Sequence, residues 1–307
     1  MSVRIGVVGP GAIAERHVAA LAGAGAQVAA VAGPDERQTR AFAERHGIPA
    51  RYRTADDLYA HPWLDAVVIA SPHEHHAAQT IAALRAGLHV LCEIPVALSL
   101  ADAERVAAVS AETGRHVAVA HTLRFCAPYL KARDLRLDLR HVVARTLMHR
   151  QSDHGVDGRP RAWTDDVLWH HGAHTVDAAL WLLGADAAAV HGTRGDPWAG
   201  SGRPMDAGAV LRVPGGGLAT IALSYHARLP ARDLTLIAEE RTLRLTGGRL
   251  LDHDGTVLAD GGADMERDGL DRQDRAFLAA VASGRRPECA VADVLPAMRV
   301  LHEWGTP

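Results

Sequence analysis

The sequence predicts two domains: an α/β domain with a doubly wound parallel sheet, followed by an α+β domain with a large, open, mainly antiparallel sheet. Three observations carry this prediction. Short apolar runs alternate with helix-like segments through the first third, a glycine-rich loop follows the first run, and strand-like runs separated by Gly and Pro turns dominate the later part. A chain of 307 residues has room for two domains of about 100–200 residues each.

The first third alternates strands and helices as βαβ units do, which predicts a parallel sheet. Ser99 is the expected N-cap of one helix, and Gly87 and Gly114 are expected just after the ends of two. Strand-like runs lie at 3–8, 28–32, 65–71, 88–92 and 115–120, and helices are expected at 12–25, 35–47, 74–87 and 99–114. The first domain is therefore assigned to residues 1–120.

The second domain is assigned to residues 121–307. Tight turns such as Pro214-Gly215-Gly216-Gly217 join consecutive strand-like runs, so their sheet should be antiparallel. The expected strands are 141–149, 187–194, 207–213, 218–225, 234–238, 241–246, 249–252 and 256–259; the expected helices are 123–138, 167–183, 271–283 and 293–304, with a polar loop at 151–166. One face of an open sheet exposes apolar surface, so we expect a homodimer or homotetramer.

Composition and charge argue against several classes of protein. A net charge of −3, with 19 histidines counted as neutral, offers no basic field for nucleic acid or an anionic membrane. No run approaches the roughly 18 apolar residues of a membrane span, and no signal-peptide pattern opens the sequence. The cysteines Cys92, Cys126 and Cys289 lie far apart, which argues against a disulfide framework or a structural zinc site and predicts a cytoplasmic protein.

A glycine-rich loop, Gly9-Pro10-Gly11-Ala12-Ile13-Ala14, follows the first strand and opens the first helix. In a dinucleotide-binding loop the first glycine permits the tight turn and the second lets the backbone approach the pyrophosphate. The third small residue lets helix and strand pack closely, and the pyrophosphate lies at the positive helix end. Because the pattern stands between a strand and a helix, it favours a cofactor site formed by Gly9, Gly11, Ala12, Ile13 and Ala14 over a purely structural turn.

The end of the second strand bears on the choice between NAD and NADP. An acidic residue there would hold the adenine ribose of NAD, but the sequence reads Ala32-Gly33-Pro34-Asp35-Glu36-Arg37. Asp35 comes late for that role, and Arg37 could meet a 2′-phosphate. The pattern slightly favours NADP and leaves NAD open.

Two more loops follow strands at the same expected edge of the sheet, where ligands of doubly wound sheets bind. They are Ser71-Pro72-His73-Glu74-His75-His76 and Cys92-Glu93-Ile94-Pro95. From these loops we expect six residues at the nicotinamide half of the cofactor: Ser71, Pro72, His76, Glu93, Ile94 and Pro95.

With the glycine loop and His174-x-x-Asp177, these motifs resemble the glucose-fructose oxidoreductase/inositol dehydrogenase (Gfo/Idh/MocA) family over essentially the full length. The resemblance implies a Rossmann domain, an open-sheet domain, a C-terminal helix that returns to the Rossmann domain, and NAD(P)-dependent chemistry at hydroxyl and carbonyl carbons. The family's third motif is commonly Glu-Lys-Pro, whose lysine assists the reacting oxygen. Ile94 can neither donate a proton nor carry charge, so another residue does this work or catalysis is lost.

The segment Trp169-His170-His171-Gly172-Ala173-His174-Thr175-Val176-Asp177 is rich in histidine. On an α-helix His170, His174 and Asp177 would share one face. The resemblance implies that His174 lies near the nicotinamide and that His170 stands where an aspartate is usual. Because histidine suits acid–base work, we expect His174 with His170 to remove the hydroxyl proton. Asp177 could orient a histidine or form an ion pair elsewhere. Ordinary polar packing remains an alternative; a metal site is disfavoured because a third ligand is missing.

The sequence also resembles, more narrowly, family members that oxidise a carboxylated cyclic hemiacetal with NADP in the bacterial breakdown of aromatic compounds. This resemblance rests on Glu93-Ile94-Pro95, His121-Thr122-x-Arg124-Phe125, the motifs within 160–177, and Gln273-Asp274-Arg275-x-Phe277. A hemiacetal hydroxyl is more acidic than a sugar alcohol, which fits the missing lysine. Arg124 and Arg161 could anchor substrate carboxylates or form ion pairs. Trp163 and His171 are further candidates for substrate binding, although Trp163 could equally be packed in the core.

Two alternatives stay open at the level of the sequence. One is a sugar or cyclitol dehydrogenase of the same family that has diverged at Ile94. The other is a catalytically silent NAD(P)-binding protein. The helix 271–283 is expected to be structural, with Asp274 exposed in one interpretation.

Overall fold

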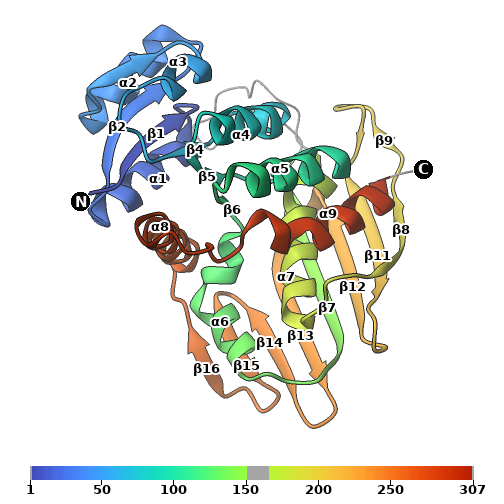
Figure 1. The fold of residues 1–307 in the computed structure, drawn as a ribbon. Helices are drawn as coiled ribbons and strands as arrows, with labels where there is room; N and C mark the ends of the chain where they lie inside the picture. Colours follow the sequence, from blue (N-terminus) through green and yellow to red (C-terminus); the bar gives the residue numbers. More distant parts are fainter. Residues whose placement is uncertain (1, 151–165, 306–307) are drawn as a thin grey trace. The chain divides into compact units, whose positions relative to one another are not determined.

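The computed structural model describes residues 2–150 and 166–305, and the chain divides into two compact units (Figure 1). The first unit comprises residues 1–120 and 270–293, and the second comprises 121–269 and 294–307. The sequence assigned 1–120 and 121–307 to two domains, so the first unit takes a segment from the C-terminal part as well as the N-terminal third.

The first unit is built on a six-stranded parallel sheet with strand order β3-β2-β1-β4-β5-β6. Its strands are β1 (Arg4–Val8), β2 (Gln27–Ala32), β3 (Ala50–Tyr52), β4 (Ala66–Ile69), β5 (His89–Cys92) and β6 (Val117–Val119). Its helices are α1 (Ala12–Gly23), α2 (Glu36–His46), α3 (Ala55–Tyr59), η1 (His73–His75), α4 (His76–Arg85), α5 (Leu100–Thr113) and, from Leu270 on, α8 (Met265–Ser283). The doubly wound parallel sheet predicted from the sequence is confirmed.

Local sequence signals explain where several of these helices begin and end. The Asp35 side chain accepts a hydrogen bond from the backbone N–H of Gln38 and caps α2, and Ser99 caps α5 in the same way. Gly114 follows α5 in the left-handed conformation, with φ of 65°. The sequence analysis missed β3 and α3, because elements of three and five residues are too short to show a period.

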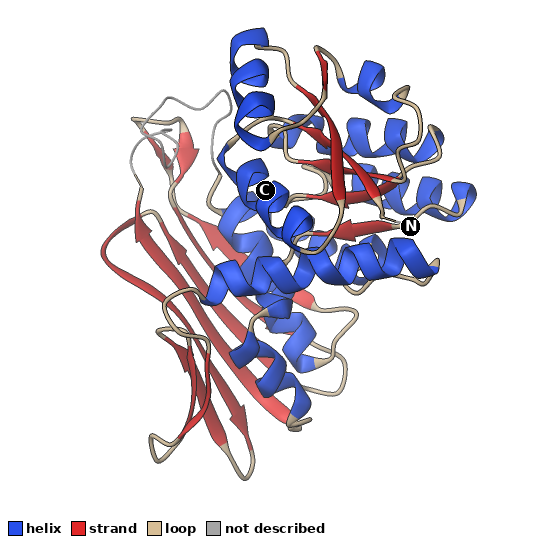
Figure 2. Ribbon diagram, turned by 90° about the vertical axis from the view of Figure 1, so that its left-hand side faces the viewer, coloured by secondary structure: helices blue, strands red, loops and turns tan. Residues whose placement is uncertain are grey.

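The second unit is built on an eight-stranded mixed sheet with strand order β16-β15-β14-β13-β7-β12-β11-β8. Its strands are β7 (Leu139–His149), β8 (Ala189–Arg194), β11 (Asp206–Arg212), β12 (Leu218–Ser224), β13 (His226–Ala238), β14 (Thr242–Thr246), β15 (Arg249–Asp252) and β16 (Val257–Asp260), and a small hairpin pairs β9 (Pro197–Trp198) with β10 (Arg203–Pro204). Only β7 and β12 pair in parallel within this sheet. The open, mainly antiparallel sheet predicted for the second domain is confirmed (Figure 2).

Helices pack on one face of this sheet, because its strands alternate buried and less buried side chains. In β12, Ala219, Ile221 and Leu223 are buried, and α7 (Ala173–Leu183) packs against β12 and β7. The other helical segments of the second domain are η2 (Thr122–Phe125), α6 (Ala127–Asp134), η3 (Leu168–Gly172) and α9 (Val291–Gly305). Along the described residues, no helix combines the length and the apolar character needed to cross a membrane.

Three expectations for the second domain were wrong in detail. The single helix expected over 123–138 is a 3-10 turn followed by the short helix α6, because Pro128 restarts the helix at its first turn. The helix expected over 167–183 begins as the π-helical turn η3. The strand expected at 234–238 begins at His226, since its first half is too polar to show an apolar run.

Candidate active site

The glycine loop has the shape that a dinucleotide requires. Gly9 has φ of +93°, and a Cβ atom there would lie 2.6 Å from the carbonyl oxygen of Ala70. A Cβ at Gly11 would meet nothing within 4 Å, and Gly11 caps α1 without a side-chain hydrogen bond. Ala14 is fully buried, as close helix–strand packing demands. The N-terminal amides of α1 therefore fit a pyrophosphate at the positive helix end.

The residues after β2 are arranged differently from an NAD-type acidic clamp. The Asp35 carboxylate, exposed to solvent, is already used as the N-cap of α2. Arg37, two residues later in the first turn of α2, is exposed. The other carboxylate of the first turn, Glu36, pairs with Arg40. The first turn therefore offers the guanidinium of Arg37, whereas both of its carboxylates already have partners.

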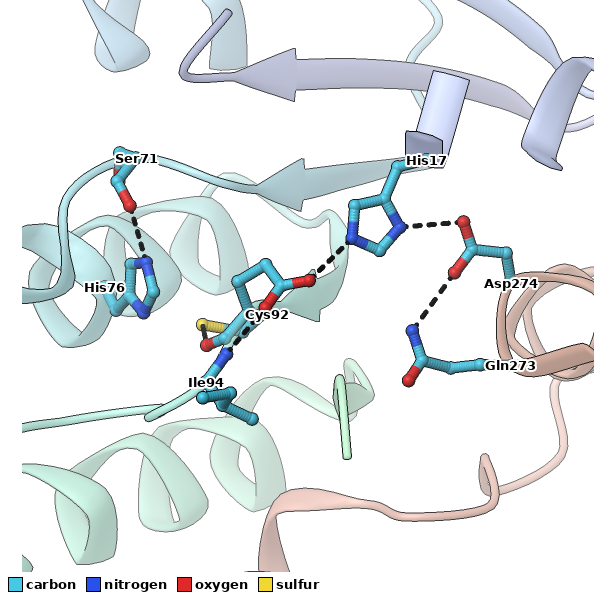
Figure 3. A network of polar contacts seen from close by, with 8 residues as sticks. His17, Ser71, His76, Cys92, Ile94, Gln273 and Asp274 are labelled. Atoms are coloured by element: carbon cyan, nitrogen blue, oxygen red, sulfur yellow. Dashed lines mark hydrogen bonds and ion pairs between the residues drawn. The ribbon is translucent and has the colours of Figure 1, made fainter. Parts of the chain in front are cut away.

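The loop after β4 is held by its own side chains. Ser71 Oγ donates to Gln79 Oε1 at 2.5 Å. His76 is fully buried, and its Nδ1 lies 2.8 Å from the carbonyl oxygen of Pro95. Its Nε2 lies 2.8 Å from the carbonyl oxygen of Ser71 (Figure 3). The sequence placed His76 against the cofactor, but the ring has no exposed surface and instead joins the Ser71-Pro72 loop to the Glu93-Ile94-Pro95 loop.

The loop after β5 presents one polar side chain. Glu93 is partly exposed, whereas Ile94 and Pro95 are buried. The backbone N–H of Ile94 donates to Glu93 Oε2 at 3.1 Å, which turns the carboxylate back over its own loop. Contact of the cofactor with the side chains of Ile94 and Pro95, expected from the sequence, is not supported, because both are covered by protein.

A buried histidine joins this loop to two helices. His17 on α1 lies with Nε2 2.9 Å from Glu93 Oε1 and Nδ1 2.8 Å from Asp274 Oδ2, and Gln273 Nε2 donates to Asp274 Oδ1 at 3.2 Å (Figure 3). Burial alone would lower the pKa of His17, but the carboxylates of Asp274 and Glu93 raise it to about 10. The pKa of Glu93 is lowered, because its hydrogen bond with His17 outweighs the effect of burial.

Sequence reasoning missed His17 and misjudged Asp274. Asp274 is completely buried, although one interpretation of the sequence had placed it on the exposed side of its helix. The signal for His17 was present: with Ala14, Val18 and Leu21 it falls on the buried face of α1. A histidine on such a face needs a polar partner, and its partners lie 76 and 257 residues away, beyond the reach of local patterns.

In the second unit, the histidine segment winds as a π-helix before α7 begins. The N–H of Gly172 donates to the carbonyl oxygen of Val167 at 2.9 Å, five residues back. His170 stacks on His171 with ring centroids 4.2 Å apart. The wider turn moves His170 off the α-helical face that it was expected to share with His174, and His171 takes its place beside His174 in lining a small cavity.

His174 is the candidate base with the most distinctive surroundings. Its Nδ1 is buried and has no hydrogen-bond partner within residues 2–150 and 166–305. The cavity beside it measures about 10 Å³, roughly one water-sized sphere, and is lined by Leu123, Tyr129, Thr146, His171, His174, Thr175, Arg232 and Leu234. Burial, together with the nearby His121 and Arg232, lowers the pKa of His174 well below 6.5, so its imidazole is neutral at physiological pH.

Arg124, a candidate to hold a substrate carboxylate, and Asp177, a candidate to orient a histidine, form an ion pair with each other. Asp177 is buried and accepts two hydrogen bonds from Arg124, from Nε at 2.8 Å and from Nη2 at 2.6 Å. Asp177 Oδ2 also lies 3.5 Å from His121 Nδ1, and the His121 and His174 rings stand nearly perpendicular with centroids 5.5 Å apart. The structure thus shows the ion-pair interpretation of both residues, and a free carboxylate clamp at Arg124 is not supported.

Two predicted residues, Arg161 and Trp163, lie outside the described residues. Arg232, on β13, was not singled out from the sequence, yet it lines the cavity beside His174 and pairs with Glu266. A wider hollow of about 600 Å³ on the same unit contains the ion pairs Arg145–Asp233 and Arg232–Glu266 and none of the predicted site residues. Within the part of the chain that the structure describes, no three His, Cys, Asp or Glu side chains gather as a metal site requires.

Two family models match the chain. The oxidoreductase family with an NAD-binding Rossmann fold matches residues 3–121, and the C-terminal region of bacterial oxidoreductases matches residues 127–242. Among curated relatives, a 4-carboxy-2-hydroxymuconate-6-semialdehyde dehydrogenase from a Sphingobium species is 32% identical over 98% of this chain and 97% of the relative. Inositol 2-dehydrogenase 1 of Saccharopolyspora erythraea is 34% identical over 63% of this chain and 59% of the relative.

Solved structures share the fold at lower sequence identity. An oxidoreductase from Agrobacterium radiobacter, in complex with NAD+, L-tartaric acid and magnesium, has a TM-score of 0.87 and 20% identity, covering 98% of this chain and 94% of its own. A putative myo-inositol dehydrogenase from Sinorhizobium meliloti has a TM-score of 0.81 and 24% identity, covering 98% and 95%. These likenesses concern the arrangement of the backbone.

Proposed function

Because the chain belongs to the Gfo/Idh/MocA oxidoreductase family, a family of NAD-binding dehydrogenases, we propose that it oxidises the cyclic hemiacetal of 4-carboxy-2-hydroxymuconate-6-semialdehyde to 2-pyrone-4,6-dicarboxylate. The observation that carries the proposal is the full-length similarity to a dehydrogenase named for that substrate. The departure at Ile94 supports it, because a hemiacetal hydroxyl needs less help to lose its proton than a sugar alcohol.

In this reaction His174 takes the hydroxyl proton. A base must be unprotonated at working pH, and burial keeps the imidazole of His174 neutral. His121, which lies 3.5 Å from Asp177, packs perpendicular to the His174 ring and would help His174 to keep one orientation. His171 is buried beside His174, and His170, which stacks on it and is partly exposed, would offer aromatic surface to a planar substrate ring.

The bound nicotinamide supplies the hydride acceptor, so the carbon that loses hydride becomes the lactone carbonyl while the proton leaves through His174. On the protein side, Gly9, Gly11 and the amides of Ala12, Ile13 and Ala14 bind the pyrophosphate. Ser71, Pro72 and Glu93 supply the loop edge for the nicotinamide half.

We propose NADP as the preferred cofactor. Asp35 is committed to capping α2, and Arg37 offers a guanidinium to a 2′-phosphate. Fluorescence titration should give a lower Kd for NADPH than for NADH, and Arg37→Gln should remove most of that difference. Equal affinities in the unmodified protein would favour NAD.

A sugar or cyclitol dehydrogenase is the second candidate, favoured by the inositol 2-dehydrogenases among the relatives. Steady-state formation of NAD(P)H with the muconate semialdehyde, against a panel of inositols and hexoses, decides between the two. His174→Asn should lower kcat by about 10²–10⁴-fold with little change in the cofactor Kd. Turnover of an inositol or hexose with none of the semialdehyde would overturn the proposal.

We also propose that the protein is a homodimer or homotetramer that pairs through the open face of its eight-stranded sheet. Val210 in β11 is 40% exposed on the second unit, and the helices that the structure describes in that unit lie on the opposite face of the sheet (Figure 2). Light scattering gives the mass. A monomer at micromolar concentration would contradict this assignment.

A further inference from the structure

We propose that His17 is a positioning residue of the cofactor site: held as an imidazolium by Asp274, it fixes the Glu93 carboxylate that borders the nicotinamide half. Nothing in the sequence motifs assigns His17 this role. The inference rests on the proposed function only in taking Glu93 as a residue that faces the cofactor.

His17 joins the helix of the glycine loop to the loop after β5. His17 lies on α1, about one helical turn after Ala14, so its ring is anchored to the helix that carries the pyrophosphate loop. From there Nε2 reaches Glu93 Oε1 at 2.9 Å, on the loop after β5. One side chain therefore ties the pyrophosphate half of the site to the nicotinamide half.

The hydrogen-bond partners of His17 require a protonated, positively charged ring. Both ring nitrogens of His17 lie within hydrogen-bond distance of a carboxylate oxygen, and a neutral imidazole has only one N–H to donate. An imidazolium donates to both carboxylates, and it also keeps the buried Asp274 carboxylate and the partly exposed Glu93 carboxylate from facing each other unpaired. The cationic ring is thus the form that satisfies the geometry.

Of the three side chains His17, Asp274 and Glu93, Glu93 is the one that is exposed to solvent. His17 and Asp274 are completely buried, whereas the Glu93 side chain is 16% exposed and is the part of the network that a ligand can reach. Glu93 Oε1 accepts from His17 and Oε2 accepts from the N–H of Ile94, and each oxygen keeps a second lone pair. A donor group such as a carboxamide N–H could bind there, at an oxygen whose position His17 sets.

The side chains that support His17 come from α8. Asp274 comes from α8, 257 residues after His17, and Gln273 on the same helix donates to its other oxygen. Through two hydrogen bonds, one between Asp274 and His17 and one between His17 and Glu93, α8 thereby reaches the cofactor loop. A helix that was expected only to brace the sheet also sets the orientation of a ligand-facing carboxylate.

The test measures cofactor binding without substrate, so its result is independent of which hydroxyl compound is oxidised. Kd values for NADPH and NADH are measured by fluorescence for the full-length protein and for His17→Gln, Asp274→Asn, Glu93→Gln and the double variant Asp274→Asn/Glu93→Gln. His89→Gln is the matched control, since His89 is a buried histidine of the same unit, hydrogen-bonded to the backbone N–H of His116.

His17→Gln and Asp274→Asn should each weaken binding about tenfold, the loss of one charge-assisted hydrogen bond, while His89→Gln changes Kd by less than about twofold. Asp274→Asn should have almost no further effect once Glu93 is Gln, because Asp274 acts through Glu93. Additive effects in the double variant, or folded His17→Gln with an unchanged Kd, would overturn the proposal.

If His17→Gln does not fold, NMR of the unmodified protein keeps the proposal testable. The ring nitrogens of His17 should both be protonated at pH 8 and stay so until about pH 10. A neutral ring at pH 8 would rule out the imidazolium bridge.

Discussion

His17 and His174 are both buried histidines, and their neighbours drive their pKa values in opposite directions. Two carboxylates raise the pKa of His17 to about 10, although burial alone would lower it. Burial and the neighbouring basic groups lower the pKa of His174. The His17 ring is therefore cationic and the His174 ring neutral at physiological pH, and the difference comes from what surrounds each ring.

The raised pKa of His17 links stability to pH. The folded pKa lies above the unfolded value near 6.5, so the stabilisation by His17 is complete below about pH 6.5 and is lost as pH rises through 10. Urea unfolding of the protein and of His17→Gln should show the largest difference at pH 6 and a small one above pH 10. Breaking such a buried ion network costs about 3–5 kcal/mol. A difference that grew between pH 7 and 10 would contradict the assignment.

We expect the lowered pKa of His174 to set the acid limb of the pH–rate profile. If His174 is the base, kcat/KM should stay high as pH falls through 6.5 and decline only below it, because the neutral ring persists to lower pH than in an ordinary histidine. A pH–rate profile measures the limb. His226→Asn, which removes an exposed histidine paired with Asp206, should leave it in place. A limb above pH 6.5 would point to a different base.

At the scale of elements, the sequence predicted the helices and strands that have a regular apolar period or that are bounded by capping residues and glycines. Ser99 and Gly114 bound α5 as expected, and the glycine loop stands between β1 and α1. The π-helical turn was not predicted, because i→i+5 winding leaves no distinct spacing in the sequence, and it changed which histidine neighbours His174. The partners of His17 were not predicted because the fold, not local spacing, brings them together.

The close approach of the Gly9 backbone to the backbone of Ala70 can be tested by comparing substitutions at Gly9 and at Gly25. Gly9 and Gly25 both have positive φ, +93° and +88°, but only at Gly9 would a Cβ meet backbone atoms, at 2.6 Å. Gly25→Ala adds backbone strain of about 1–3 kcal/mol alone. Gly9→Ala adds the clash with Ala70 and should lower the melting temperature further and abolish cofactor binding, measured by thermal unfolding and fluorescence titration. Equal effects of the two variants would show that close approach is not what Gly9 provides.

At the scale of the whole chain, the two-domain order was predictable, whereas the share of the C-terminal part in the first unit was known only from the resemblance. Phe277 on α8 is 1% exposed and belongs to the core cluster that contains Ile5, Val7 and Leu91. Its partners lie some 190–270 residues earlier in sequence, so no local pattern could assign them. The first unit therefore depends on residues that follow most of the second unit in the sequence.

This dependence is testable with Phe277→Ala. Removing a large aromatic side chain from a packed core costs about 3–5 kcal/mol, since the cavity collapses only in part. The loss should appear as a lower melting temperature that saturating NADPH partly restores, because the cofactor binds the folded first unit. Trp63→Ala, at a tryptophan 77% exposed on the same unit, should cost less than about 0.5 kcal/mol. If Phe277→Ala proved as mild as Trp63→Ala, the C-terminal helix would be an accessory to the sheet and the first 120 residues would suffice to hold it.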